Sequence, residues 1–202
     1  MPLALSKSLT LPSWVEPFLT GWEESLHTPE GRMRLAVALS AENVARKTGG
    51  PFAAVIFEAD SHRVVAAGVN VVVPQGTSLA HGEVVALLLA QEALGTHDLG
   101  RRDLPIFEMA TTSQPCIQCY GALIWSGVHK VLVGARGSDV ETIVGFDEGP
   151  VPADWVGQWA LRGIETQVDV LREEACAVLQ AYKESGAPVY NSDRTVEGRT
   201  HV

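Results

Sequence analysis

Hydrophobic positions along the chain follow two kinds of pattern. Apolar residues that recur every three or four positions are typical of helices with one buried face, and they predict helices over residues 29–47, 80–94, 116–126 and 170–183. Short runs rich in β-branched residues, bounded by turn residues, predict strands over residues 52–58, 63–73, 106–112, 130–135 and 165–168. Thr28 is the expected N-cap of the first helix, with Pro29 at its first position, and Asp169 is the expected cap of the last helix.

The order of these elements predicts the fold class. Strands that alternate with helices favour a largely parallel sheet with helices on both faces. The turn over residues 59–62 makes the first two strands a hairpin, so the sheet must be mixed. We therefore expect an α/β fold, a three-layer α/β/α sandwich around a mixed, roughly five-stranded central sheet. Residues 136–159, rich in Gly, Pro and Asp, are expected to be a functional loop or to contain short helices.

Length and composition limit the classes of protein that this chain can represent. It has 202 residues, 46% hydrophobic and 19% charged, which fits one globular domain and excludes disorder as the main state. The net charge of −9, without a basic cluster, argues against nucleic acid as a partner. No apolar run reaches the roughly 18 residues of a membrane span, and three cysteines make no disulfide framework. We expect a cytoplasmic protein with no membrane partner.

Two short motifs carry the chemistry of the sequence, His81-Gly82-Glu83 and Pro115-Cys116-Ile117-Gln118-Cys119. A Cys-x-x-Cys pair at the start of a helix is either a redox dithiol or part of a zinc site. Counting ligands separates the two readings. The third cysteine, Cys176, lies in the last predicted helix, where a small buried apolar role is expected. Two cysteines and one histidine leave a fourth position for water, which describes a catalytic zinc.

A catalytic zinc also needs a nearby carboxylate that moves protons without binding the metal. Glu83 follows His81 by two residues at the start of the same predicted helix and is placed for that role. His-x-Glu followed by Pro-Cys-x-x-Cys is the zinc deaminase signature.

On these residues the sequence resembles the zinc-dependent cytidine deaminase superfamily over residues 29–185, and within it the bacterial guanine deaminases. The supporting stretches are residues 49–54, 68–70, 78–83, 121–128 and 145–150. The resemblance implies a cytidine deaminase-like fold over residues 29–185, an N-terminal extension over 1–28 and a C-terminal tail over 186–202. It further implies one Zn²⁺ per chain, held by His81, Cys116 and Cys119, and hydrolysis of a free purine base, guanine to xanthine and ammonia.

The resemblance also assigns roles to other residues. Glu83 would be the catalytic proton carrier, and Glu148 would assist it from the loop. The implied substrate-binding residues are Phe52, Asn70, Ala80, Gly82, Pro115, Trp125 and Asp147. Structural readings stay open at this point, because Asn70 also suits a turn, Phe52 and Trp125 also suit packing, and acids in loops are usually solvated. The sequence departs from the family at Gly82, where relatives usually carry Ala, and at Val71-Val72, where many have Arg.

Three other functions remain open from the sequence alone. The first is deamination of a different amine, such as cytidine or another nucleoside, tRNA adenosine, or an aminotriazine such as ammeline. The second is a redox protein that uses Cys116 and Cys119, and the third is a deaminase-like binding scaffold. The resemblance further implies a homodimer or larger assembly, in which C-terminal tails carrying Tyr190 exchange between subunits to close the partner's pocket.

Overall fold

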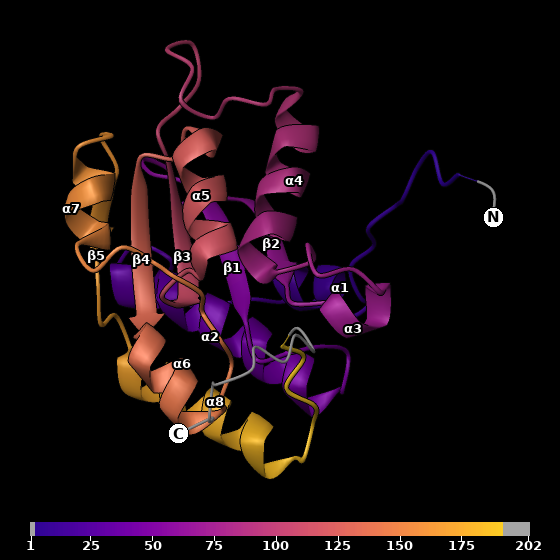
Figure 1. Cartoon of the computed structure of the whole chain (residues 1–202). Coiled ribbons are helices and arrows are strands. Elements are labelled where there is room, and N and C mark those ends of the chain that lie inside the picture. Colours follow the sequence, from indigo (N-terminus) through magenta and orange to yellow (C-terminus); the bar gives the residue numbers. More distant parts are fainter. Residues whose placement is uncertain (1–2, 192–202) are drawn as a thin grey trace.

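The chain folds around one mixed sheet, shown in the computed structural model of Figure 1, which describes residues 3–191. Its strands are β1 (Ala53–Glu58), β2 (Val64–Val69), β3 (Phe107–Ser113), β4 (Lys130–Ala135) and β5 (Glu165–Gln167). They lie in the order β2-β1-β3-β4-β5. The pairs β1/β2 and β1/β3 are antiparallel, whereas β3/β4 and β4/β5 are parallel. This confirms the predicted mixed five-stranded sheet.

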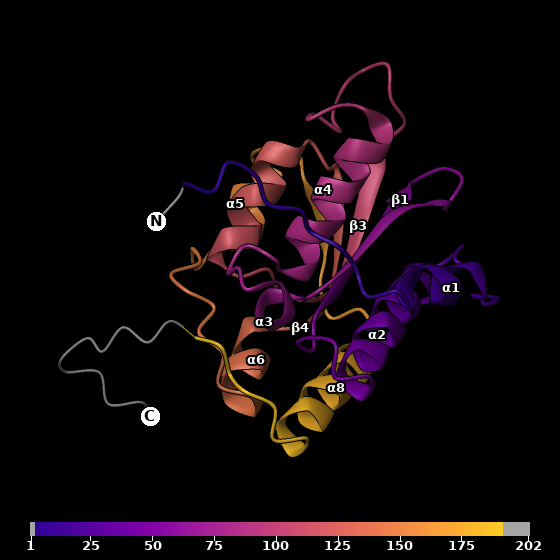
Figure 2. The same cartoon turned by 90° about the vertical axis from the view of Figure 1, so that its right-hand side faces the viewer.

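Helices cover both faces of the sheet (Figures 1 and 2). The helices are α1 (Val15–Thr20), α2 (Pro29–Ala45), α3 (Val72–Gln75), α4 (Gly82–Leu94), α5 (Ile117–Ser126), α6 (Gly137–Ile143), α7 (Trp155–Ala160) and α8 (Arg172–Glu184). Helices α2 and α8 lie on one face and α4 and α5 on the other. Along β1, Val55 and Phe57 join the core beneath α2 and α8, while Ala54 and Ile56 join the core beneath α4 and α5. A strand buried on both faces is the mark of a three-layer α/β/α sandwich, as predicted.

Local signals place several helix ends. The Thr28 hydroxyl accepts a hydrogen bond from the Gly31 N–H at 3.0 Å, which caps α2 as expected. Helix α4 ends at Gly95, whose φ of +64° is the left-handed conformation that glycine adopts most easily. The expected cap Asp169 is wrong. Its carboxylate pairs with Arg136 instead, and α8 begins only at Arg172.

One other predicted boundary needs correction. The second strand was expected to run to residue 73, but β2 ends at Val69 and the short helix α3 follows. The Asn70 side chain accepts a hydrogen bond from the Val72 N–H and turns the backbone out of the sheet, and Pro74 further on lacks the N–H that a sheet ladder requires. Residues 136–159, which were expected to be a functional loop or to contain short helices, contain the short helix α6 and most of the short helix α7.

The N-terminal segment packs on the main core. Val15 of α1 is 1% exposed and belongs to the same buried cluster as Met33 of α2. The domain limits at residues 28 and 185 stay predictions, and residues 192–202 of the predicted tail lie outside the described residues. Within residues 3–191, the structure contains no helix with the length and apolar character of a membrane span.

Candidate metal centre and cavity

Strand pairing brings three distant segments to one edge of the sheet. The end of β3 lies beside the beginning of β1, because Ala54 pairs with Thr111 in antiparallel register. The end of β2 joins them, since Val69 pairs with Ala53. Residues just beyond these strand ends, Phe52 and Asn70 among them, therefore meet at this edge, where α4 and α5 also begin.

The two sequence motifs form one cluster at this edge. His81 precedes the first turn of α4, Cys116 precedes the first turn of α5, and Cys119 lies within that turn. The Nδ1 atom of His81 lies 3.4 Å from Sγ of Cys116 and 3.6 Å from Sγ of Cys119. All three ligand atoms lie within 4.8 Å of one another. Cys176 lies apart from them, half-buried on α8.

These distances match those of a tetrahedral zinc site. Zn–S bonds of about 2.3 Å and a Zn–N bond of about 2.0 Å, at the tetrahedral angle, place sulfur and nitrogen about 3.5 Å apart. Among the described residues, the three side chains are the only cluster of metal-ligating type that meets this geometry, and Glu83 is not part of it. The donor set therefore fits a metal ion with one coordination position left over.

The pKa values of the two thiols show that this cluster favours a cation. The hydrogen bond with Cys119 is the main cause that lowers the pKa of Cys116 to about 4, and His81 contributes to the same shift. The pKa of Cys119 is raised well above its usual value, mainly because its proton is held by Cys116 and because the thiol is buried. Cys116 is thus a thiolate at neutral pH, which is the form that binds metals.

A buried carboxyl group lies beside this cluster. Glu83 occupies the first turn of α4, is 5% exposed, and accepts a hydrogen bond from the Thr111 hydroxyl at 3.3 Å. Burial is the main cause that raises its pKa, with a further contribution from Cys116, while His81 acts in the opposite direction. A raised pKa brings the carboxyl group nearer to the pH at which a proton carrier is most effective.

The cluster opens into a cavity of about 260 Å³. Its lining consists of Phe52, Asn70, His81, Glu83, Ser113, Gln114, Cys116, Ile117, Gln118, Phe146, Asp147, Glu148, Gly149, Tyr190 and Asn191. The structure thus brings together seven of the predicted site residues along this lining. Cys119 is fully buried directly behind it.

Asn70 is held firmly in the cavity wall. It is 2% exposed, and its side-chain oxygen accepts a hydrogen bond from the Val72 N–H at 3.3 Å. Its backbone N–H donates to Phe52 O, and its backbone oxygen accepts from the side-chain amide of Asn43. Within residues 3–191 its side-chain NH₂ makes no hydrogen bond and is free to meet a ligand.

Glu148 reaches the cavity from the loop after α6. Its backbone oxygen accepts a hydrogen bond from the Ile117 N–H at 2.9 Å, which ties the loop to the start of α5. Burial raises the pKa of Glu148 to about 9, and the charges of Cys116 and Glu83 add to that shift. The raised pKa favours the protonated form of the side chain, which can donate a hydrogen bond. Its neighbour Asp147 is exposed.

Four predicted substrate-binding residues lie outside the cavity lining. Ala80 and Pro115 are buried next to the motifs, and Gly82 packs against β1, where an added Cβ would lie 3.1 Å from the Cα of Ala53. Trp125 is 85% exposed at the far end of α5. Roles for these residues in binding stay predictions.

Tyr190 and Asn191 also line the cavity. The sequence predicts a role for Tyr190 only in the pocket of a partner subunit and none for Asn191. Tyr190 packs on Phe146 with ring centroids 4.6 Å apart. Asn191 accepts a hydrogen bond from the Asp147 N–H and donates one to Gly145 O, both at 3.0 Å. The segment before residue 192 therefore closes one side of the cavity of its own chain. Only the aromatic character of Tyr190 signalled such a role in the sequence.

Several known proteins are similar to this chain in sequence and in structure. Guanine deaminase from Bacillus subtilis is 34% identical over 116 residues, which are 57% of this chain and 69% of that protein. The solved guanine deaminase from Nitrosomonas europaea is 43% identical, with a TM-score of 0.83, and the match covers 91% of this chain and all of that one. A solved complex with 2,6-diaminopurine is 44% identical, with a TM-score of 0.84 and coverage of 91% and 96%.

The family match coincides with the metal centre. The model of the cytidine and deoxycytidylate deaminase zinc-binding region matches residues 27–135, which include α2, the strands β1 to β4, and both motifs. That range is more than half of the chain. This protein therefore belongs to the family of zinc-binding cytidine and deoxycytidylate deaminases.

Proposed function

We propose that this protein is a zinc-dependent hydrolase that converts guanine and water to xanthine and ammonia. The observation that carries the proposal is the buried carboxyl group of Glu83 beside the His81, Cys116 and Cys119 cluster, at the wall of a cavity of about 260 Å³. That volume lies at the small end for ligand pockets and suits a single base rather than a nucleotide or an RNA strand. The relatives that are guanine deaminases support the choice of base.

His81, Cys116 and Cys119 are the residues that would hold zinc. The chemistry that zinc supplies when bound is a lowered pKa of water in the site, which makes this water a nucleophile near neutral pH. The lowered pKa of Cys116 favours the thiolate form, which is the form that binds metals.

Glu83 carries protons during the reaction. It accepts a proton from the attacking water and delivers it to the ring nitrogen next to carbon 2 of guanine, which makes that carbon more electrophilic. A bond forms between carbon 2 and the water oxygen, and the bond from carbon 2 to the amino nitrogen breaks. The remaining water proton goes to the leaving amine, so that one water yields one carbonyl oxygen and one ammonia.

Other cavity residues hold the base during these steps. The free NH₂ of Asn70 donates to an acceptor on the base, and Phe52, whose ring lies 5.3 Å from that of Phe146, packs against its face. The protonated Glu148 is placed to donate a proton or a hydrogen bond from the loop, and Asp147 accepts from a ring or amino N–H. The raised pKa of Glu148 supports its role.

Ammonia release tests the proposal directly. Purified zinc-loaded protein is incubated separately with guanine, guanosine, adenine, cytosine, cytidine, ammeline and a tRNA, and both ammonia and product are measured. We expect ammonia from guanine, matched by equal xanthine. Release from another amine alone would retain the deaminase chemistry and reject guanine as substrate. Purine binding without ammonia would support a binding scaffold, and a titratable disulfide in a protein that takes up no zinc would support a redox protein.

We further propose that the protein is a cytoplasmic homodimer. The outer surfaces of α4 and α5 carry the exposed apolar side chains Leu88 and Trp125, and a second copy of this chain would cover them. Cys116, Cys119 and Cys176 form no disulfide with one another, which suits a reducing compartment. Exchange of C-terminal tails between subunits stays a prediction.

A further inference from the structure

Gln114 is a cavity residue to which the proposed reaction assigns no role. It directly follows β3 and lies two residues before Cys116, and its backbone N–H donates to Ala135 O at 2.8 Å. The side chain is half-buried and lines the cavity. Its position fixes it on the same wall as the metal ligand Cys116.

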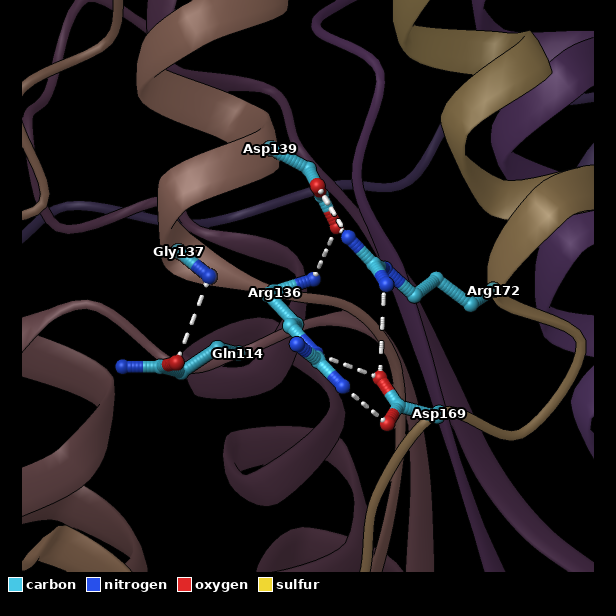
Figure 3. A network of polar contacts seen from close by, with 6 residues as sticks. All are labelled: Gln114, Arg136, Gly137, Asp139, Asp169 and Arg172. Atoms are coloured by element: carbon cyan, nitrogen blue, oxygen red, sulfur yellow. Dashed lines mark hydrogen bonds and ion pairs between the residues drawn. The ribbon is translucent and has the colours of Figure 1, made fainter.

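The orientation of the Gln114 carboxamide is determined by Gly137. The Gly137 N–H donates to Oε1 of Gln114 at 3.2 Å, as Figure 3 shows. Rotating the carboxamide by 180° would place its NH₂ against another N–H donor, so one orientation is favoured. The approach is close enough that a Cβ on Gly137 would lie 3.3 Å from the carboxamide carbon and nitrogen.

The Gly137 N–H is itself held in place by a network of charged groups at the start of α6 (Figure 3). Asp139 accepts a hydrogen bond from the Arg136 N–H at 2.8 Å and two from Arg172 at 2.6 and 2.7 Å. Asp169 accepts two from the Arg136 guanidinium at 2.7 and 2.8 Å. These paired contacts join α6 to α8 and keep the first turn of α6 in position.

The remaining donor of Gln114 has no protein partner. Its Nε2 points away from Gly137 in Figure 3, and no hydrogen bond from it is formed within residues 3–191. Gln118 lines the same cavity, but its Nε2 is fully shielded. Asn191 uses both ends of its amide on the loop. Asn70 and Gln114 are therefore the two amides that offer a fixed, free NH₂ to a bound base.

We propose that Gln114 determines specificity by donating a hydrogen bond to the carbonyl oxygen at carbon 6 of the purine. This inference rests on the proposed function and deepens it. Carbon 2 must face Glu83 and the metal cluster. A side chain next to Cys116 therefore lies beside the six-membered ring of the purine. Carbon 6, which carries the carbonyl oxygen, belongs to that ring and is separated from carbon 2 by one ring nitrogen. A 6-amino group would place a donor against the Gln114 NH₂, so the site prefers a 2-amino-6-oxopurine to 2,6-diaminopurine.

The variant Gln114→Glu isolates this donor. The carboxylate keeps an acceptor for the Gly137 N–H, so the start of α6 is retained, but it replaces the NH₂ by an oxygen. We measure kcat and KM for guanine and for 2,6-diaminopurine, together with the dissociation constant of each base by calorimetry. We expect kcat/KM for guanine to fall about tenfold or more, mainly through KM, and the guanine preference to shift about tenfold or more toward 2,6-diaminopurine.

Two further variants keep the test decisive. Gln180→Glu makes the same change on the exposed side of α8, outside the cavity, and should leave the ratio of the two bases unchanged. Gln114→Met adds no charge and should weaken guanine binding more than 2,6-diaminopurine binding, even if Gln114→Glu fails to fold. An equal loss for both bases in the Gln114 variants overturns the specificity role while leaving guanine deamination intact. A wild-type enzyme that releases no ammonia from guanine rejects the proposed function and this inference with it.

Discussion

Replacing Glu83 by glutamine separates proton transfer from metal binding. The side chain is 5% exposed and Thr111 donates to one of its oxygens. Glutamine has nearly the same shape and keeps that acceptor, so the first turn of α4 and the three metal ligands stay in place. What the substitution removes is the ability to accept and return a proton.

The expected loss follows from that missing step. General acid–base catalysis by a positioned side chain contributes roughly 10²- to 10⁴-fold in rate. At about 1.4 kcal/mol per factor of ten, this raises the barrier by about 3–5 kcal/mol. We expect kcat to fall by a factor in this range or by a larger one, because Glu83 both accepts a proton from water and delivers it to the ring nitrogen.

The assay combines three measurements on the same preparation. Ammonia release gives kcat and KM for guanine, elemental analysis gives zinc per chain, and thermal unfolding confirms the fold. The matched control is Glu92→Gln, which makes the same change on the exposed side of the same helix and should retain the wild-type rate. A Glu83→Gln enzyme that works at full rate would falsify the assignment of proton transfer. Loss of zinc would instead place Glu83 among the metal ligands.

Three other predictions concern stability and assembly. Arg32→Met leaves the buried carboxylate of Glu108 without its partner. The substitution should reduce the free energy of unfolding, measured by urea titration, by about 3–5 kcal/mol. A loss below about 1 kcal/mol would contradict this prediction. The hydrogen bond from Arg172 lowers the pKa of Asp139 to about 2, so this pair stabilises the fold above pH 4 and loses its effect as the pH falls from 4 to 2. Asp139→Asn should therefore reduce the free energy of unfolding by about 1–2 kcal/mol at pH 7, allowing for solvent screening, and by almost nothing at pH 2. An equal reduction at both pH values would contradict the pairing. Trp125→Glu should shift the dimer to monomer in sedimentation velocity, and an unchanged sedimentation coefficient would exclude this face as the interface.

Local sequence signals predicted most of the fold. Caps and glycines act within one turn of a helix, so Thr28 and Gly95 placed their helix ends well. These local signals failed where a residue distant in the sequence binds the side chain that would otherwise cap the helix. Asp169 has a side chain suited to capping, but the Arg136 guanidinium from another segment takes both of its oxygens.

Residual errors in the strands and loops have a similar cause. Val71, Val72 and Val73 favour a strand, yet the side chain of Asn70 accepts from the Val72 N–H and turns the backbone out of the sheet. Helix α6 escaped detection because only Gly137 and Val140 are buried along it, which leaves no apolar period to recognise. Ion pairs with α8 hold it in place instead.

The two halves of the cavity differ in how far the sequence predicts them. Its metal half consists of residues at the starts of two helices, so the spacing within each motif determines which side chains converge. The half that we propose to bind the base depends on pairs of residues far apart in the chain, Gln114 with Gly137 and Asp147 with Asn191. No periodicity reports such contacts, because each pair is brought together by the order of the strands. Short motifs therefore predict the type of reaction. The choice of base, in our proposal, depends on tertiary contacts around the same edge of the sheet.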